Sequence, residues 1–217
     1  MAGTLSSFIF RGFQNKFNNL CINLLIDAYH SSISGNSISL DFEENDITAI
    51  LHHYIDENPK RKEWEIFTNR EEYLFDKDSI QVKGFAAKFS RIDMRYSTFW
   101  EGEEYKYFVE AKNLKSKVSS LKRRYIATGI DNFLTGGKYE NCDGILLGYI
   151  LEGSSENCKE GINKLLLKDK RINEIINYNE LIINNHKIYE SSHSQRNIKH
   201  LFFDYSNWYL WVTFKPK

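Results

Sequence analysis

The segment 144–150 constrains the fold of this chain more than any other part of the sequence. It reads Gly-Ile-Leu-Leu-Gly-Tyr-Ile, an apolar run without a single charge. Such a run is typical of a strand buried on both faces, which requires helices above and below a sheet. The amphipathic stretch 118–134 precedes it and is followed by two glycines. The sequence therefore predicts a helix that crosses over between two neighbouring strands.

The spacing of apolar residues predicts the other elements. Helices are expected at 8–28, 44–57 and about 158–178, and Asn58-Pro59 is expected to end the second of them. Strands are expected at 64–69, 85–98, 105–112, 187–190 and 200–214.

This order of elements predicts an α/β fold, with a three-layer α/β/α core around a central mixed β-sheet. A single domain is expected to span 1–217, because no linker or internal repeat divides the chain. Its core is expected at about 44–150. A helical segment, 1–40, precedes the core, and a helix and strand extension, 151–217, follows it.

The charge balance and the cysteine spacing argue against several classes of protein. Lys plus Arg and Asp plus Glu both number 29, so any contact with nucleic acid must come from local patches. Three cysteines without paired spacing argue against a disulfide framework or a zinc site. No secretory leader and no membrane-spanning run is recognised. We therefore expect a cytoplasmic protein that does not contact a membrane.

Two carboxylates and a lysine form the pattern with the clearest chemistry. Glu110 and Lys112 project from the same face of a strand, because side chains alternate along it. If a hairpin turn centres on Glu101-Gly102, Asp93 in the preceding strand faces Glu110, with β-carbons roughly 5 Å apart. Two carboxylates at that separation repel each other, and a divalent cation such as Mg²⁺ removes the conflict.

The Glu-x-Lys pattern alone carries little weight, because Glu104-Tyr105-Lys106 repeats it upstream. Other interpretations stay open at this point. Glu110 and Lys112 could belong to a surface strand of alternating charge, and Asp93 could pair with a neighbouring arginine. The specific feature is the combination of an apolar strand, an upstream Asp and a basic helix that follows.

Taken together, these residues resemble the PD-(D/E)XK nuclease superfamily, which has the restriction-endonuclease-like fold, and within it small bacterial members of the defence type. The proline that names the motif is absent before Asp93, where Ile92 stands. The resemblance covers about 44–150. It is carried by Glu44-Asn45-Asp46-Ile47-Thr48, Arg91-Ile92-Asp93-Met94, Phe108-Val109-Glu110-Ala111-Lys112, 125–133 and Gly137-Lys138-Tyr139.

The resemblance implies a metal-dependent endonuclease that hydrolyses phosphodiester bonds in DNA, as a restriction or phage-defence effector. Asp93, Glu110 and the backbone carbonyl of Ala111 would hold Mg²⁺ or Mn²⁺. Lys112 would orient or deprotonate the attacking water, or stabilise the charge that develops on the phosphate. Glu44 would act as a further or outer ligand, although a first-turn acid also suits the helix dipole.

Contacts to the nucleic-acid backbone are expected from a basic helix and its surroundings. A solvated helix face is the alternative for its central Lys-Arg-Arg run. The candidates are Lys115, Lys117, Lys122, Arg123, Arg124, Lys138 and Tyr139.

Several alternatives remain open at the level of function. RNA could replace DNA as the substrate, or the fold could serve as a catalytically inactive binding or assembly module. An unrelated α/β interaction protein is a third reading. A homodimer is expected if both strands of a duplex are cut, because that needs two sites. An activating partner protein would leave no recognisable trace in the sequence.

Overall fold

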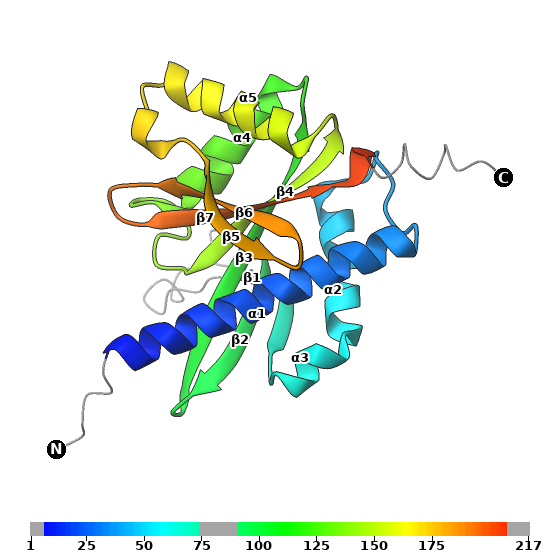
Figure 1. Ribbon diagram of the computed structural model, residues 1–217, viewed down its shortest axis with the longest axis vertical. Coiled ribbons are helices and arrows are strands. Elements are labelled where there is room, and N and C mark those ends of the chain that lie inside the picture. Colours follow the sequence, from blue (N-terminus) through cyan, green and yellow to red (C-terminus); the bar gives the residue numbers. More distant parts are fainter. Residues whose placement is uncertain (1–6, 74–90, 208–217) are drawn as a thin grey trace, which may run out of the picture.

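The computed structural model describes residues 7–73 and 91–207, and its seven strands form one mixed sheet (Figure 1). The spatial order of the strands is β1-β2-β3-β4-β7-β6-β5. β3, β4 and β7 run parallel to one another, and the remaining neighbours pair antiparallel. The strands are β1 (Phe67–Tyr73), β2 (Arg91–Trp100), β3 (Glu103–Lys115), β4 (Gly144–Glu152), β5 (Asn177–Ile183), β6 (His186–Ser192) and β7 (Asn197–Asp204).

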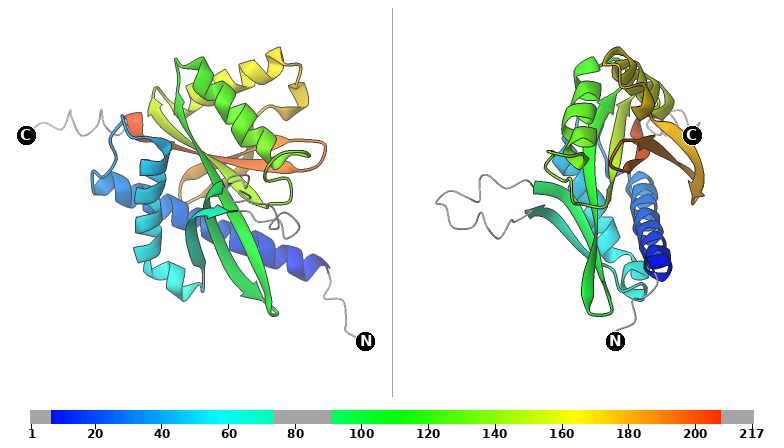
Figure 2. Two further views of the ribbon diagram at one scale, coloured as in Figure 1. Left: turned by 180° about the vertical axis from the view of Figure 1, so that it is seen from behind. Right: turned by 90° about the vertical axis from the view of Figure 1, so that its left-hand side faces the viewer.

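Helices cover both faces of this sheet, and in the side view α1 lies on one side of it and α4 on the other (Figure 2). One apolar cluster lies under α1 and α2, and a second lies under α4 and α5. The predicted α/β fold with a three-layer core around a mixed sheet is therefore confirmed. The helices are α1 (Ser7–Ser34), α2 (Glu44–Glu57), α3 (Pro59–Glu63), α4 (Ser119–Tyr125) and α5 (Ser155–Lys168).

β4 is the strand buried on both faces, as its apolar run predicts. Ile145 and Leu147 pack into the cluster under α1 and α2, whereas Leu146 and Ile150 pack into the cluster under α4 and α5. The crossover from β3 to β4 begins with α4 and continues as a π-helical turn, Ile126–Ile130, and a 3-10 turn, Asp131–Phe133. The predicted helix at 118–134 is right in extent, but only its first half is α-helical.

The hairpin between β2 and β3 has the predicted register. Its two turn residues are Glu101 and Gly102, and both adopt positive φ, 49° and 86°. Positive φ at both positions matches the twist of the flanking strands, as in a type I′ turn. The ladder runs from Trp100 opposite Glu103 to Met94 opposite Val109.

Some predicted boundaries are wrong. α1 continues to Ser34 instead of ending near residue 28, and within it the Ser32 hydroxyl donates to the Tyr29 carbonyl (2.7 Å). α5 ends at Lys168, because Lys170 adopts a φ of 62°. The second half of the helix predicted at 158–178 is therefore not helical throughout, and β5 was missed.

The predicted start of the first strand is also wrong, because a short helix precedes the strand. Pro59 begins the short α3, capped by the Asn58 side chain, so β1 starts at Phe67 instead of residue 64. Parts of two predicted strands, 85–90 and 208–214, lie outside the described residues.

The three cysteines, Cys21, Cys142 and Cys158, are free. Within the described part of the chain, no helix is long and apolar enough to cross a membrane.

The middle of β4 leaves no room for a side chain at Gly148. A β-carbon there would lie 2.6 Å from Phe202 Cδ1 and 2.9 Å from Leu114 Cδ1. We expect Gly148→Ala to lower the free energy of unfolding by about 1–3 kcal/mol through overpacking. Urea denaturation measures the change.

Gly12→Ala is the matched control, because Gly12 lies in α1 with no atom within 4 Å of the added carbon. This variant should be neutral or stabilising by up to about 1 kcal/mol, since alanine favours helix. Equal destabilisation of both variants would contradict the close packing at Gly148.

Candidate active site

The candidate site lies where β2 separates from β3. The ladder between the two strands ends at Met94 and Val109, one residue before Asp93 would pair with Glu110. Met94 packs under α1 and α2, whereas Ile92, two residues earlier, packs under α4 and α5. Side chains two residues apart lie on the same face of a regular strand, so β2 twists between these two residues. The predicted register is right, and the predicted pairing of Asp93 with Glu110 does not form.

The separation exposes backbone groups on the edge of β3, and two acidic side chains bond them. In an antiparallel ladder the N–H and C=O of alternate residues point to the same neighbour, so those of Ala111 and Asn113 point where β2 would continue. Asp93 Oδ2 accepts from the Ala111 N–H (2.7 Å), and Glu44 Oε2 accepts from the Asn113 N–H (3.0 Å). Both carboxylates are thereby held against the same strand.

The ammonium of Lys112 lies at the centre of these groups. Its Nζ is 2.5 Å from Glu110 Oε1, 2.7 Å from the Ala111 carbonyl oxygen and 3.4 Å from Glu44 Oε1. Arg124 of α4 donates to the same oxygen of Glu44 (2.8 Å). The Glu110 and Lys112 side chains are 6% and 5% exposed, which excludes the interpretation that they belong to a solvated strand of alternating charge.

Glu44 lies in the first turn of α2, and the hydrogen bonds that fix this turn also fix the position of Glu44 in the cluster. Glu43 caps the helix, and a reciprocal bond joins the Glu43 N–H to Asp46 Oδ2 (3.0 Å). Such a capping box satisfies two backbone N–H groups at the start of the helix and so fixes its first turn. Glu44 thus satisfies both interpretations of the sequence, since it lies in the first helical turn and also faces the candidate site.

The buried charges shift one another's pKa values. Burial raises the pKa of Glu110 to about 7, and the nearby Asp93 carboxylate adds to the rise against the opposing effect of Lys112. Burial also raises the pKa of Asp93, although Lys112 and the Ala111 N–H lower it. For Lys112 burial acts to lower the pKa, but Glu110, Glu44 and Asp93 outweigh it and the pKa is raised. The lysine is therefore a cation at neutral pH.

The donor set suits a hard divalent cation. Carboxylate and carbonyl oxygens are the ligands that Mg²⁺ accepts, and Glu110 Oε2 is buried without a partner among the described residues. In their present positions, however, no group of three or more His, Cys, Asp and Glu side chains within 7–73 and 91–207 is arranged to hold a metal ion. Lys112 donates to Glu110 and to the Ala111 carbonyl, two of the three predicted ligands, so a metal there requires its ammonium to turn away.

A pocket of about 450 Å³ opens beside Glu44, and Asn113, Lys115 and Arg124 contribute to its wall. Asn113 was not predicted as a site residue. Its side-chain amide donates to the Phe42 carbonyl (3.2 Å), which ties β3 to the segment before α2. No sequence pattern marks such a contact, because it joins residues 71 positions apart.

The residues predicted to contact nucleic acid fall into two groups. Lys117, Arg124 and Lys138 are exposed, and Lys115 and Arg123 are half-buried. Lys122 and Tyr139 are buried instead.

The two buried residues make hydrogen bonds within the protein. The Lys122 ammonium donates to the Ser116 carbonyl (2.6 Å), and the Tyr139 hydroxyl donates to the Arg91 carbonyl (2.8 Å) at the start of β2. Arg123 forms an ion pair with Asp169. The face of α4 that carries Arg124 is therefore the one that belongs to the site.

No family model, curated protein or solved structure matches this chain. The resemblance to PD-(D/E)XK nucleases stays a prediction from the sequence motifs.

The raised pKa of Glu110 predicts a pH-dependent stability. A carboxyl group whose pKa rises from its ordinary 4.5 to about 7 on folding binds its proton more tightly in the folded state. Its contribution to stability therefore falls between those pH values and stays constant above them. Relative to wild type in EDTA, we expect Glu110→Gln to gain about 2–3 kcal/mol of unfolding free energy between pH 5 and pH 8, at about 1.4 kcal/mol per pKa unit.

Urea denaturation at several pH values measures this difference. Titrating groups outside this cluster, such as the buried histidines, are common to both proteins and cancel in the comparison. Parallel stability curves for wild type and Glu110→Gln would show that Glu110 titrates normally.

Proposed function

We propose that this chain is a metal-dependent endonuclease that hydrolyses phosphodiester bonds in DNA. The observation that supports the proposal is the convergence of Glu44, Asp93, Glu110 and Lys112 on one opening between β2 and β3. In the fully ionised state three carboxylates face two cations, Lys112 and Arg124, which leaves a net negative charge that a divalent cation can balance.

Asp93, Glu110 and the Ala111 carbonyl are the residues that would hold Mg²⁺ or Mn²⁺. When bound, such an ion lowers the pKa of a water molecule and neutralises charge on the scissile phosphate. Water adds to phosphorus, the bond from phosphorus to the departing sugar oxygen breaks, and the proton released by the water is balanced by one taken up by the leaving oxygen. The products are a phosphate monoester and an alcohol.

The charge state of Lys112 favours one of the roles expected for it. Because its pKa is raised, the ammonium stays charged at neutral pH and is a poor base. A buried cation beside the phosphate stabilises the negative charge that develops in the transition state. Of the roles expected from the sequence, charge stabilisation therefore suits Lys112 better than proton abstraction.

The cleavage test has a matched control within the same strand. Purified protein is incubated with supercoiled plasmid, linear duplex and single-stranded RNA, in Mg²⁺, Mn²⁺ or EDTA. We expect metal-dependent cleavage of DNA, with Glu110→Gln and Lys112→Met each lowering the rate constant by at least about 10²–10³-fold through lost transition-state stabilisation. Glu104→Gln and Lys106→Met alter the second Glu-x-Lys, whose side chains are exposed or half-buried, and should stay within about twofold of wild type.

A Glu110→Gln protein that cuts as fast as wild type would refute the assignment of the site. Exclusive cleavage of RNA would correct the substrate. The second candidate function is a binding module without catalysis, which is favoured by the contact of Lys112 with the predicted metal ligands. It predicts nucleic-acid binding by wild type without cleavage in any metal.

If Lys115 and Lys117 contact DNA phosphates, their removal should weaken DNA binding in a salt-dependent way. Lys115 and Lys117 lie at the end of β3 and in the loop that follows, next to the catalytic strand segment. We expect Lys115→Ala with Lys117→Ala to weaken DNA binding and to reduce the slope of log affinity against log salt by up to about 2, since each phosphate contact contributes about 0.9. Fluorescence anisotropy measures both quantities.

Lys164→Ala with Lys168→Ala removes the same charge from exposed positions on α5 and serves as the control. An equal loss of affinity in both double variants would indicate a general charge effect instead of local contacts.

A further inference from the structure

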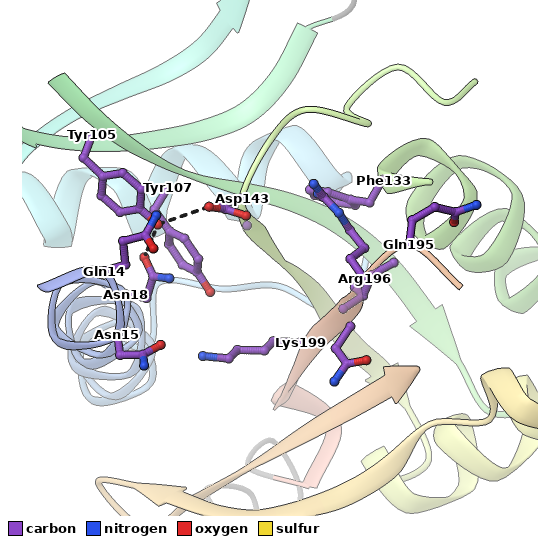
Figure 3. Close-up of a pocket in the computed structure, with 13 residues that line it drawn as sticks. Gln14, Asn15, Asn18, Tyr105, Tyr107, Phe133, Asp143, Gln195, Arg196 and Lys199 are labelled. Carbon is purple, nitrogen blue, oxygen red and sulfur yellow. Dashed lines mark hydrogen bonds between the residues drawn. The ribbon is translucent and has the colours of Figure 1, made fainter. Parts of the chain in front are cut away.

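A second pocket lies on the opposite face of the sheet from Lys112, where α1 passes the beginnings of β4 and β7 (Figure 3). Its volume is about 320 Å³, within the range of about 300–1,000 Å³ that is common for ligand sites. Tyr107 and Lys112 are five residues apart in β3, roughly 17 Å at 3.4 Å per residue, and their side chains alternate to opposite faces. The pocket is therefore separate from the candidate active site.

The hydroxyl of Tyr107 points into this pocket (Figure 3). The side chain is 1% exposed, and its hydroxyl has no hydrogen-bond partner among the described residues. Buried hydroxyl groups nearly always have a partner. Tyr105 differs, because its hydroxyl lies 3.3 Å from Asp143 Oδ2 and 3.4 Å from Asn18 Oδ1. Tyr107 thus places a buried donor, without a partner among the described residues, at the wall of the pocket.

Two cations line the same pocket. The Lys199 side chain extends toward α1, on the side where the Tyr107 hydroxyl points (Figure 3). Burial lowers the pKa of Lys199, although Glu190 and Asp143 act in the opposite direction. Arg196 donates one of its N–H groups to the Cys142 carbonyl (2.6 Å), which fixes the guanidinium at the wall. With Asp143 as the acidic group of the lining, the pocket carries a net positive charge.

Carboxamide side chains form much of the remaining wall. Each offers both a donor and an acceptor and is neutral at every pH. Carboxamides pair with the edges of nucleobases, and lysine and arginine bind phosphate. A nucleotide combines these two kinds of group in one small molecule. The carboxamides are those of Gln14, Asn15, Asn18, Gln195 and Asn197.

We propose that this pocket binds a nucleoside monophosphate, with the phosphate contacted by Lys199 and the Tyr107 hydroxyl and the base contacted by the carboxamides of α1. The site is independent of the proposed nuclease activity, because Tyr107, Lys199 and the carboxamides of α1 lie on the other face of the sheet from Lys112. It extends the function of the chain from nucleic-acid cleavage to recognition of a small ligand.

Isothermal titration calorimetry of the full chain tests this site without any cleavage assay. AMP, GMP, CMP and UMP are titrated separately in EDTA, with adenosine and inorganic phosphate for comparison. We expect saturable binding of at least one monophosphate, and at least tenfold weaker binding of adenosine and of inorganic phosphate. Tyr107→Phe and Lys199→Gln should each weaken the binding of that monophosphate by at least fivefold.

The variants have matched controls. Tyr178→Phe and Lys187→Gln make the same chemical changes at exposed positions of β5 and β6 and should bind as wild type. Tyr107→Phe removes a hydroxyl without a protein partner, so it should fold normally, which thermal unfolding verifies.

Three results would overturn the proposal. The first is the absence of saturable heat with all four monophosphates. The second is unchanged affinity in both Tyr107→Phe and Lys199→Gln. The third is loss of binding in Glu110→Gln with retention in Lys199→Gln, which would place the nucleotide in the candidate active site. Affinity for inorganic phosphate equal to that for the monophosphate would likewise exclude recognition of the base.

Discussion

The peptide groups of Ala111 and Asn113 set the arrangement on which the candidate site depends. β2 leaves β3 after Met94, and a buried N–H without a partner costs about 1–3 kcal/mol. Asp93 and Glu44 remove that cost by accepting the two N–H groups. The acidic side chains therefore complete the edge of the sheet as well as supplying charge. A carboxylate held by the backbone is positioned before any ligand arrives, which is what a metal site requires.

The same separation explains the position of Lys112. The Ala111 carbonyl would bond β2 if the ladder continued, and here it accepts from the lysine instead. Glu110 beside it is buried, and an isolated buried carboxylate is costly. The Lys112 ammonium balances the charge of the Glu110 carboxylate and donates a hydrogen bond to the Ala111 carbonyl. A divalent cation would serve the same electrostatic purpose with more charge, so the lysine and the ion compete for shared oxygens.

How much of this follows from the sequence depends on the range of the interaction. The alternation that places Glu110 and Lys112 on one face and the register of the Glu101-Gly102 hairpin are local properties, and both were predicted correctly. The end of the ladder at Met94 was not predictable, because it depends on how β2 twists between two apolar clusters. The inward turn of Lys122 was missed for a similar reason, since a basic run on a helix does not show which side chain bonds the preceding loop.

β7 has a consequence for how the chain reaches this structure. It is the last of the described strands in sequence, yet it lies between β4 and β6 and covers one edge of the most apolar strand. During synthesis the residues of β4 emerge about fifty positions before their partner. Until then the strand has an open hydrogen-bonding edge, the kind of surface that promotes aggregation. The central sheet can close only after most of the polypeptide has left the ribosome, so folding is expected to be late and cooperative instead of progressing from the first helix onward.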